Sequence, residues 1–228
     1  MIYMIKNNEG ITLAELLVAI SIIGILALIV APQIGLFRSG YNVRSCGTDL
    51  IQNMRAARAM AIKENREYLI VFDTANQRYL IGFDGDIPTD GDLVTANSDT
   101  YGICNDTDGD RLPNGDTLVN GVPLCVRVVR INECGNNIIF GYGSGTTPPN
   151  GPNGLAIDPS GITFTGTPPT AEFDADGSTD KQWSVYFQQT TRGYSYVVVI
   201  SNNVGSINMW KWDGDADNPG VTTWTEIR

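Results

Sequence analysis

Residues 7–32 read NNEGITLAELLVAISIIGILALIVAP, and this stretch decides how the chain is organised. From residue 11 to residue 31 the only charged side chain is that of Glu15. A helix over these residues is ~30 Å long, which is the thickness of the hydrocarbon core of a bilayer. The stretch therefore predicts a membrane-spanning helix over residues 11–32 that carries one carboxylate.

The order of features differs from that of a secretory signal peptide, in which the small-residue cleavage site follows the apolar region. Here Gly10 precedes the apolar region. Cleavage after Gly10 would remove residues 1–10 as a leader and would keep the apolar helix as the new N-terminus. We therefore expect the mature chain to begin at Ile11.

The segment GITLAELLVAI resembles the class III signal of type IV pilins and type II secretion pseudopilins, in which a glycine and usually a phenylalanine precede Thr-Leu-x-Glu-Leu. Gly10 and Glu15 match this pattern, whereas Ile11 replaces the usual phenylalanine and Glu9 makes the leader less basic than is usual. The resemblance implies cleavage and N-methylation by a prepilin peptidase. It also implies a subunit that lies in the inner membrane before assembly and in an extracellular or periplasmic filament afterwards.

Glu15 raises an energetic problem that such a filament would solve. A lone carboxylate in hydrocarbon costs ~2.5–3.5 kcal/mol on insertion scales, so it needs a cation. In a bundle of identical helices, the amine that cleavage leaves on Ile11 of a neighbouring subunit can supply that cation. The resemblance implies such a contact, which also sets the axial register of each subunit in a helical homopolymer or a mixed filament.

Gly24 and Pro32 are the two positions around which this helix is expected to kink or to lose its helical structure. Glycine costs ~1 kcal/mol of helix propensity relative to alanine, and an internal proline costs ~3 kcal/mol. Filament subunits of the family often lose helicity around matching positions. The alternative is a kink at Pro32 where the helix leaves the membrane.

Residues 33–67 are expected to continue as an amphipathic helix. Its apolar and small residues are spaced four and three apart, as on one face of a helix, and the segment resembles the H-type branch of pseudopilins, in which L-x-x-A-R-x-x-A-I leads into the first strand. We expect the small residues to let a sheet pack closely, while Arg55, Arg58, Lys63 and Arg66 lie between them; a binding role for these basic side chains is the alternative. The predicted buried face consists of Val43, Gly47, Leu50, Met54, Ala57 and Ala61.

Residues 68–228 read as a strand-rich globular head. EYLIVFD and RYLIGFD flank TANQ as an antiparallel hairpin. Further strands are expected in PLCVRVVRI, NNIIFGYG, GITFTG, KQWSVYFQQ and GYSYVVVISNNVGSINMWKW. The predicted fold class is α+β, a pilin fold in which the long N-terminal helix packs on an antiparallel sheet with long Asp- and Gly-rich loops.

Four loops contain 14 of the 18 aspartates, so the acidity of the chain is concentrated in loops. Calcium takes six to eight oxygen ligands, and D-x-D-x-D spacing can supply several of them. The calcium ligands predicted in this way are Asp106, Asp108 and Asp110 first, and Asp213, Asp215 and Asp217 second. A weaker version occurs at Asp174, Asp176, Ser178 and Asp180. The alternative is a solvated surface of aspartate-capped turns.

The four cysteines are Cys46, Cys104, Cys125 and Cys134, and none forms a C-x-x-C pair of the kind that binds zinc. An even number of cysteines in an exported chain favours disulfides, but four cysteines allow three pairings. Our preferred pairing joins Cys104 to Cys125 and Cys46 to Cys134, and buried thiols are the alternative.

Charge and composition exclude several functions. The formal net charge is −10 and the chain has no histidine, so nucleic acid is not expected as a partner and the commonest general base is missing. No nucleophile or phosphate-binding motif is present, so we do not expect an enzyme. The predicted function is a structural subunit of a type IV pilus-like or type II secretion filament. The alternatives are a membrane-anchored calcium-binding module and a minor pilin for DNA uptake.

Overall fold

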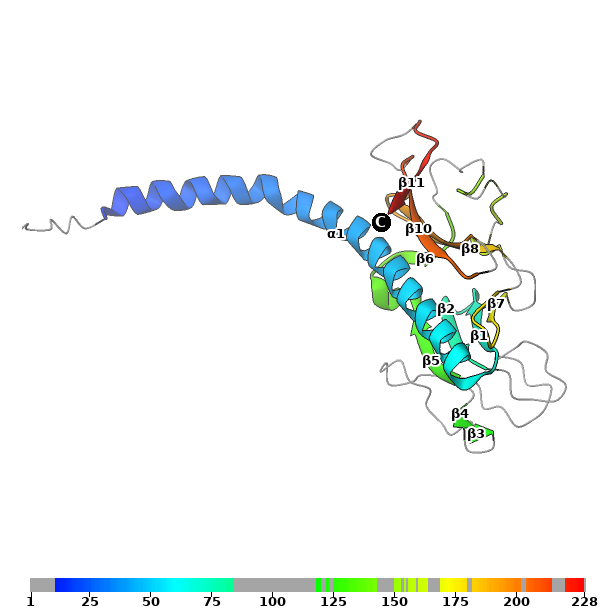
Figure 1. The fold of residues 1–228 in the computed structure, drawn as a ribbon. Coiled ribbons are helices and arrows are strands. Elements are labelled where there is room, and N and C mark those ends of the chain that lie inside the picture. The colour runs from blue at the N-terminus through cyan, green and yellow to red at the C-terminus, as the bar shows by residue number, and fades with distance from the viewer. Residues whose placement is uncertain are drawn as a thin grey trace, which may run out of the picture. The chain divides into compact units, whose positions relative to one another are not determined.

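A computed structural model of the protein gives the backbone of a long helix followed by a head of two antiparallel sheets (Figure 1). The chain divides into two compact units between Arg38 and Ser39, which we call the N-terminal unit and the head unit. Side chains are not described for residues 29–37, 118–119 and 122–123. The described residues are 11–83, 118–119, 122–123, 125–142, 150–152, 154, 156–158, 160–163, 169–179, 182–201, 204–214 and 220–227.

Helix α1 extends over Leu13–Glu64 and passes from the first unit into the second. It is followed by β1 (Tyr68–Asp73), β2 (Arg78–Gly82) and the two-residue strands β3 (Leu118–Val119) and β4 (Val122–Pro123). Then come β5 (Cys125–Arg130), the 3₁₀ helix η1 (Ile131–Cys134), β6 (Ile138–Phe140) and β7 (Thr170–Phe173). The last strands are β8 (Trp183–Gln189), β9 (Ser195–Ile200), β10 (Ile207–Trp212) and β11 (Trp224–Ile227).

The head contains two main sheets rather than the single sheet that the sequence predicted. The first has the strand order β5-β2-β1-β7 and the second has the order β11-β10-β9-β8-β6, while β3 and β4 pair only with each other. All of these strand pairs are antiparallel. The α+β fold class is therefore confirmed, with a second sheet added.

The hairpin β1–β2 was predicted correctly from the sequence. Asp73 pairs with Arg78 at its end, and Arg78 Nε donates a 2.8 Å hydrogen bond to Asp73 Oδ2. The backbone N–H of Asn76 donates to the other carboxylate oxygen of Asp73 at 3.0 Å. Burial raises the pKa of Asp73, but the hydrogen bonds from Asn76 and Arg78 outweigh it and leave that pKa below its usual value.

The expected strand over residues 161–166 is not a full strand. Ile162 forms a single antiparallel bridge with Val185 of β8, and residues 164–166 lie outside the described residues. Strands β7 and β11 were not predicted. Each is four residues long and lies at the edge of its sheet.

The predicted buried face of α1 is confirmed at every position. Gly47 shows why small residues are needed on it, because a Cβ atom at this position would lie 2.8 Å from Met209 Sδ and 3.7 Å from Val198 Cγ2. Both of these residues belong to the second sheet, on β10 and β9. A Cβ atom at position 47 would therefore require the Met209 side chain to move, and glycine fits this contact without such a change.

One apolar core joins the helix to both sheets. It includes Leu50 and Met54 of α1 and the aromatic rings of both sheets. The ring of Phe140 lies 5.9 Å from that of Phe72 in the first sheet and 5.6 Å from that of Phe187 in the second. These contacts make the head unit a single packed body.

Polar side chains on α1 also bind the sheets, which the sequence did not predict. Asn53 is 1% exposed, and its amide nitrogen donates a 2.6 Å hydrogen bond to the hydroxyl of Tyr79. Arg127 of β5 donates a 2.6 Å hydrogen bond to the Asn53 amide oxygen. On the same helix, Arg58 Nε donates to the carbonyl oxygen of Gly177 at 2.8 Å. Arg58 therefore helps to attach α1 to the turn that contains Gly177.

A disulfide joins Cys46 of α1 to Cys134 of η1, with a Cα–Cα distance of 5.4 Å, and confirms one predicted pairing. Cys125 is buried on β5. Its predicted partner, Cys104, lies outside the described residues, so that second pairing stays a prediction.

Removing the Cys46–Cys134 disulfide should lower the stability of the head. The bond closes a sequence separation of 88 residues, and losing a native disulfide of this kind costs about 2–5 kcal/mol. Denaturant unfolding of Cys46→Ala/Cys134→Ala under non-reducing conditions should show a lower midpoint than the wild type. Peptide mapping without reductant should recover the two cysteine peptides joined in the wild type, and equal midpoints would contradict the stabilising role.

Candidate functional site

The N-terminus of α1 is closed by a reciprocal set of hydrogen bonds between Thr12 and Glu15. Glu15 Oε2 accepts a hydrogen bond from the backbone N–H of Thr12 and another from its hydroxyl, both at 2.9 Å. The backbone N–H of Glu15 donates to Thr12 Oγ1 at 3.2 Å. This is a capping box, which satisfies N–H groups that have no partner within the helix.

This cap was not predicted, although Thr-x-x-Glu before an apolar run is its usual signature. The cap gives Glu15 a role within its own helix, in addition to the expected ion pair with the Ile11 amine of a neighbouring subunit. A carboxylate in the first turn of a helix is also favoured by the helix dipole, typically by about 0.3–1 kcal/mol. Part of the charge of Glu15 is therefore compensated within the monomer.

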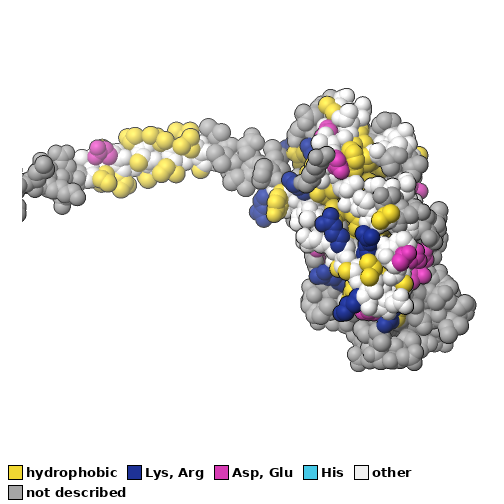
Figure 2. All heavy atoms as spheres, in the orientation of Figure 1, with side chains coloured by type: hydrophobic (Ala, Val, Ile, Leu, Met, Phe, Trp, Pro, Cys, Tyr) yellow, Lys and Arg dark blue, Asp and Glu magenta, His cyan; other side chains and the backbone are white. Residues whose placement is uncertain are grey.

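The residues that follow the cap expose apolar side chains on all sides of the helix. Figure 2 shows this apolar surface on the visible side of the N-terminal unit. A helix that is apolar all round is normally surrounded by other apolar groups. The large apolar side chains that are at least 52% exposed here are Ile11, Leu13, Leu16, Leu17, Val18, Ile20, Ile22, Ile23, Ile25, Leu26 and Leu28.

No helix in the described part of the chain is both long enough and apolar enough to cross a membrane. The membrane-spanning segment expected over residues 11–32 is therefore not confirmed.

The backbone of α1 is helical through both Gly24 and Pro32. A loss of helix between these positions, expected for filament subunits, is therefore absent from the monomer. A Cβ atom at Gly24 would meet no atom within 4 Å, so nothing in the described residues requires glycine here.

Most of the predicted calcium ligands cannot be placed. Asp106, Asp108, Asp110, Asp215 and Asp217 lie outside the described residues. Among the residues that the structure describes, no three acidic or cysteine side chains form a group that could hold a metal ion. Calcium binding therefore stays a prediction.

Asp213, the remaining predicted ligand, uses its carboxylate to join two strands. Its Oδ2 atom accepts hydrogen bonds from the hydroxyls of Thr225 at 2.6 Å and Thr223 at 3.3 Å. Its backbone N–H also donates to the carbonyl of Thr223 at 3.0 Å. The described contacts of Asp213 therefore link β10 to the segment that leads into β11.

The weaker candidate at Asp174 to Ser178 forms a turn that is capped by its own side chains. Ser178 Oγ donates to Asp174 Oδ2 at 3.0 Å, and the Ser178 backbone N–H donates to Asp176 Oδ1 at 2.8 Å. Hydrogen bonds from Ser178 hold the pKa of Asp176 below its usual range. This arrangement matches the aspartate-capped turn that was the alternative to a metal site, and Asp180 lies outside the described residues.

Residues 5–31 match the prokaryotic N-terminal methylation motif. The motif is the prepilin signal of type IV pilins and pseudopilins. No curated protein and no solved structure matches the chain. The prepilin signal is characteristic of structural pilin-type proteins rather than of enzymes, and it implies processing by a prepilin peptidase and assembly with other pilins.

The prepilin signal includes the capping box and most of the exposed apolar surface of α1. Gly10, the residue before the expected cleavage, lies outside the described residues. Helix α1 begins at Leu13, two residues after the expected new N-terminus at Ile11. Processing at Gly10 would thus leave the amine close to the capped end of the helix.

We predict that the mature protein begins at Ile11. Intact-mass analysis of the protein from membranes or filaments should show the loss of residues 1–10, with or without one added N-methyl group. In a strain without the prepilin peptidase, or in a Gly10→Val variant, the full-length mass should persist. Recovery of Met1 on assembled wild-type protein would refute the cleavage.

Proposed function

We propose that the chain is a structural subunit of a type IV pilus-like or type II secretion filament that polymerises through the first half of α1. The observation that carries this proposal is the prepilin signal on a helix whose apolar side chains are exposed on every side. The subunit would be held at the inner membrane before assembly and would enter an extracellular or periplasmic filament afterwards.

The energetics support burial of this helix between subunits. Fully burying one large aliphatic side chain contributes about 1.5–3 kcal/mol relative to leaving it exposed. Eleven such side chains between Ile11 and Leu28 are exposed in the monomer. Their combined burial is the largest favourable contribution that the described surface of the N-terminal unit offers to assembly.

Apolar burial has no direction, so it cannot by itself fix the axial position of one subunit against the next. A charge contact can do so. Within the described residues, both hydrogen bonds from Thr12 go to Oε2 of Glu15, which leaves Oε1 able to accept another. We propose that the Ile11 amine of a neighbouring subunit binds this carboxylate while the cap on α1 stays in place.

The Glu15→Gln variant separates the effect of the charge on assembly from the effect of the helix cap. Glutamine can complete a capping box, because its amide oxygen accepts the same two hydrogen bonds. Glu15→Gln should therefore keep the cap and lose the ion pair, whereas Glu15→Ala loses both. We expect both variants to be processed and to accumulate at the membrane, and both to yield far fewer filaments in sheared surface material than the wild type.

Membrane accumulation provides the control for this experiment. Removing a carboxylate from an apolar helix lowers its insertion cost by ~2.5–3.5 kcal/mol, so neither variant should be lost from membranes. Wild-type filament numbers from Glu15→Gln would show that the cap, and not the charge, is what assembly requires from this residue.

We further propose that calcium stabilises the head through Asp106, Asp108 and Asp110, with Asp213, Asp215 and Asp217 as a second site. The support is the alternating aspartate spacing, because several carboxylates in one loop repel each other unless a cation lies between them. A ligand that binds only the folded state stabilises it by ~2.7 kcal/mol at a hundredfold excess over its Kd.

The head unit, prepared from residue 39 onward, should melt at a higher temperature in calcium than in chelator. Magnesium should have a smaller effect because it demands tighter octahedral geometry and retains its waters. Asp108→Asn should reduce the calcium-dependent shift, and adding Asp110→Asn should reduce it further. Asp158→Asn is the matched control, since its carboxylate is bound to Ser160 in a separate turn. Equal wild-type melting temperatures in millimolar calcium and in chelator would contradict the calcium sites and would indicate that the aspartates form only a solvated surface.

A further inference from the structure

The exposed face of α1 in the head unit carries opposite charges on its two flanks. Arg44 and Arg55 are exposed and lie eleven residues apart, which is about three helical turns or ~16 Å along the axis. They therefore share one flank of the helix. Figure 2 shows basic side chains gathered on one face of the head. We call Arg44 and Arg55 the basic flank.

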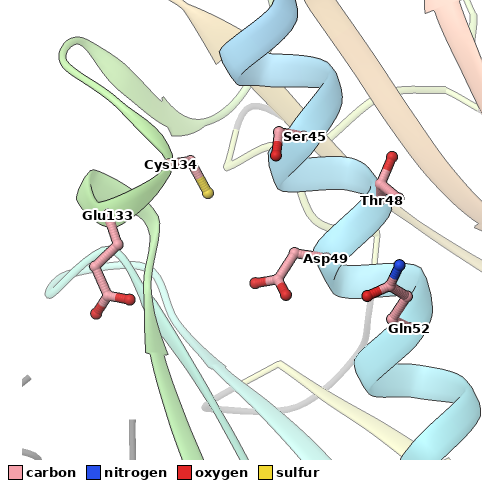
Figure 3. A pocket seen from close by; sticks show the side chains of 6 residues that line it. All are labelled: Ser45, Thr48, Asp49, Gln52, Glu133 and Cys134. Carbon is pink, nitrogen blue, oxygen red and sulfur yellow. The ribbon is translucent and has the colours of Figure 1, made fainter. Parts of the chain in front are cut away.

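The other flank of the helix borders an open polar pocket. Asp49 is rotated about 120–140° around α1 from Arg44 and Arg55, at ~100° per residue. In Figure 3 its side chain points from α1 toward the segment that carries Glu133. The pocket has a volume of about 260 Å³ and is lined by Ser45, Thr48, Asp49, Gln52, Glu133 and Cys134. We call this the acidic pocket.

The lining of the acidic pocket matches the chemistry of a guanidinium group. It offers two carboxylates, two hydroxyls and one amide oxygen, and the planar guanidinium group of arginine donates up to five hydrogen bonds. The disulfide between Cys46 and Cys134 fixes η1 to α1 at this point. The two elements that carry Asp49 and Glu133 are therefore held at a constant separation.

The distribution of charge along the chain favours a second copy of this chain as the partner of the acidic pocket. Residues 39–66 contain five basic and two acidic side chains, whereas residues 67–228 contain 21 acidic and eight basic ones. Removal of residues 1–10 takes away Lys6 and Glu9 together and leaves the net charge at −10. Copies of such a chain repel one another unless their scarce basic groups lie at the contacts between them.

We propose that the basic flank of one copy of this chain docks against the acidic pocket of the next copy, with Arg44 and Arg55 facing Asp49 and Glu133. The proposal rests on the proposed function, because filament assembly brings the copies together. The two patches differ, so the contact is heterologous, and repeated heterologous contacts that do not close into a ring form helical filaments.

Charge-reversed variants of the full-length chain, purified in detergent, test the contact directly. Arg44→Glu/Arg55→Glu and Asp49→Lys/Glu133→Lys should each lower self-association by about tenfold or more at low salt, as charge pairs at an interface do. The wild type should lose a similar amount in about 1 M salt, where the screening length is ~3 Å. Analytical ultracentrifugation measures these changes, and circular dichroism checks that each variant is folded.

Mixing the two variants gives the decisive result. The reversed flank of the first matches the reversed pocket of the second, and the unchanged flank of the second matches the unchanged pocket of the first. An equimolar mixture should therefore form alternating chains, and the fourfold variant should recover chain growth on its own. Lys63→Glu is the matched control for Arg44→Glu and Arg55→Glu made singly, because each of them reverses one positive charge and Lys63 lies on an exposed part of α1 away from the basic flank. It should associate like the wild type.

Unchanged association of both reversed variants would overturn the contact, and so would a mixture that stays monomeric. Loss of association in Lys63→Glu to the same extent would also overturn it, because the effect would then be one of net charge. Filament yield in cells separates this inference from the proposed function. A normal filament yield from Arg44→Glu/Arg55→Glu would contradict the proposed contact and leave the proposed filament function standing. Charge-dependent association of a wild type that forms no filaments would support the contact and contradict the proposed function.

Discussion

A helix with isoleucine and leucine on every side cannot remain alone in water, and the first half of α1 is such a helix. Its apolar surface has to be covered by lipid or by other copies of the same helix. The capping box at Thr12 and Glu15 lets the helix begin within two residues of the expected cleavage site. The exposed apolar surface, the prepilin signal and the single carboxylate are therefore features of one segment, for which we propose a single role in assembly.

The second half of the same helix faces the opposite requirement, since it must bury one side and leave the other exposed. Gly47 allows contact with Met209 at a distance where a Cβ atom would require the Met209 side chain to move. Asn53, Arg58 and the Cys46–Cys134 disulfide then fix the helix to the first sheet, to the turn that contains Gly177 and to η1. Because the head is attached to α1 at several points, an axial displacement of the helix in a polymer would carry the head unit with it from Ser39 onward.

Hydrophobic periodicity was sufficient to predict the buried face of α1, since spacings of three and four residues reach the core only on a helix. It also located the long strands, in which continuous runs of bulky residues such as those of β8 and β9 are buried. Strands β7 and β11 were missed because each has four residues and is defined by its pairing with β1 or β10, not by its own pattern. The division into two sheets has the same origin, because it depends on which edges pair.

The polar contacts were harder to predict from the sequence than the apolar core. Asn53 is buried because Tyr79 and Arg127, distant in the chain, complete its hydrogen bonds. The cap at Thr12 could have been predicted, since its Thr-x-x-Glu signature is local and Glu15 can serve both as a charge and as part of a helix cap. The acidic pocket was not predicted, although the predicted Cys46–Cys134 pairing already implied that Asp49 and Glu133 lie near each other across 83 intervening positions in the chain.

A helical reconstruction of sheared filaments by electron cryo-microscopy tests the central claim most directly. The account predicts that α1 from Ile11 onward forms the centre of the filament. It also predicts that the Glu15 carboxylate of each subunit lies within ~4 Å of the N-terminal amine of a neighbour, the distance of an ion pair. Filaments that lack this chain, or that carry the first half of α1 on their outer surface, would contradict it.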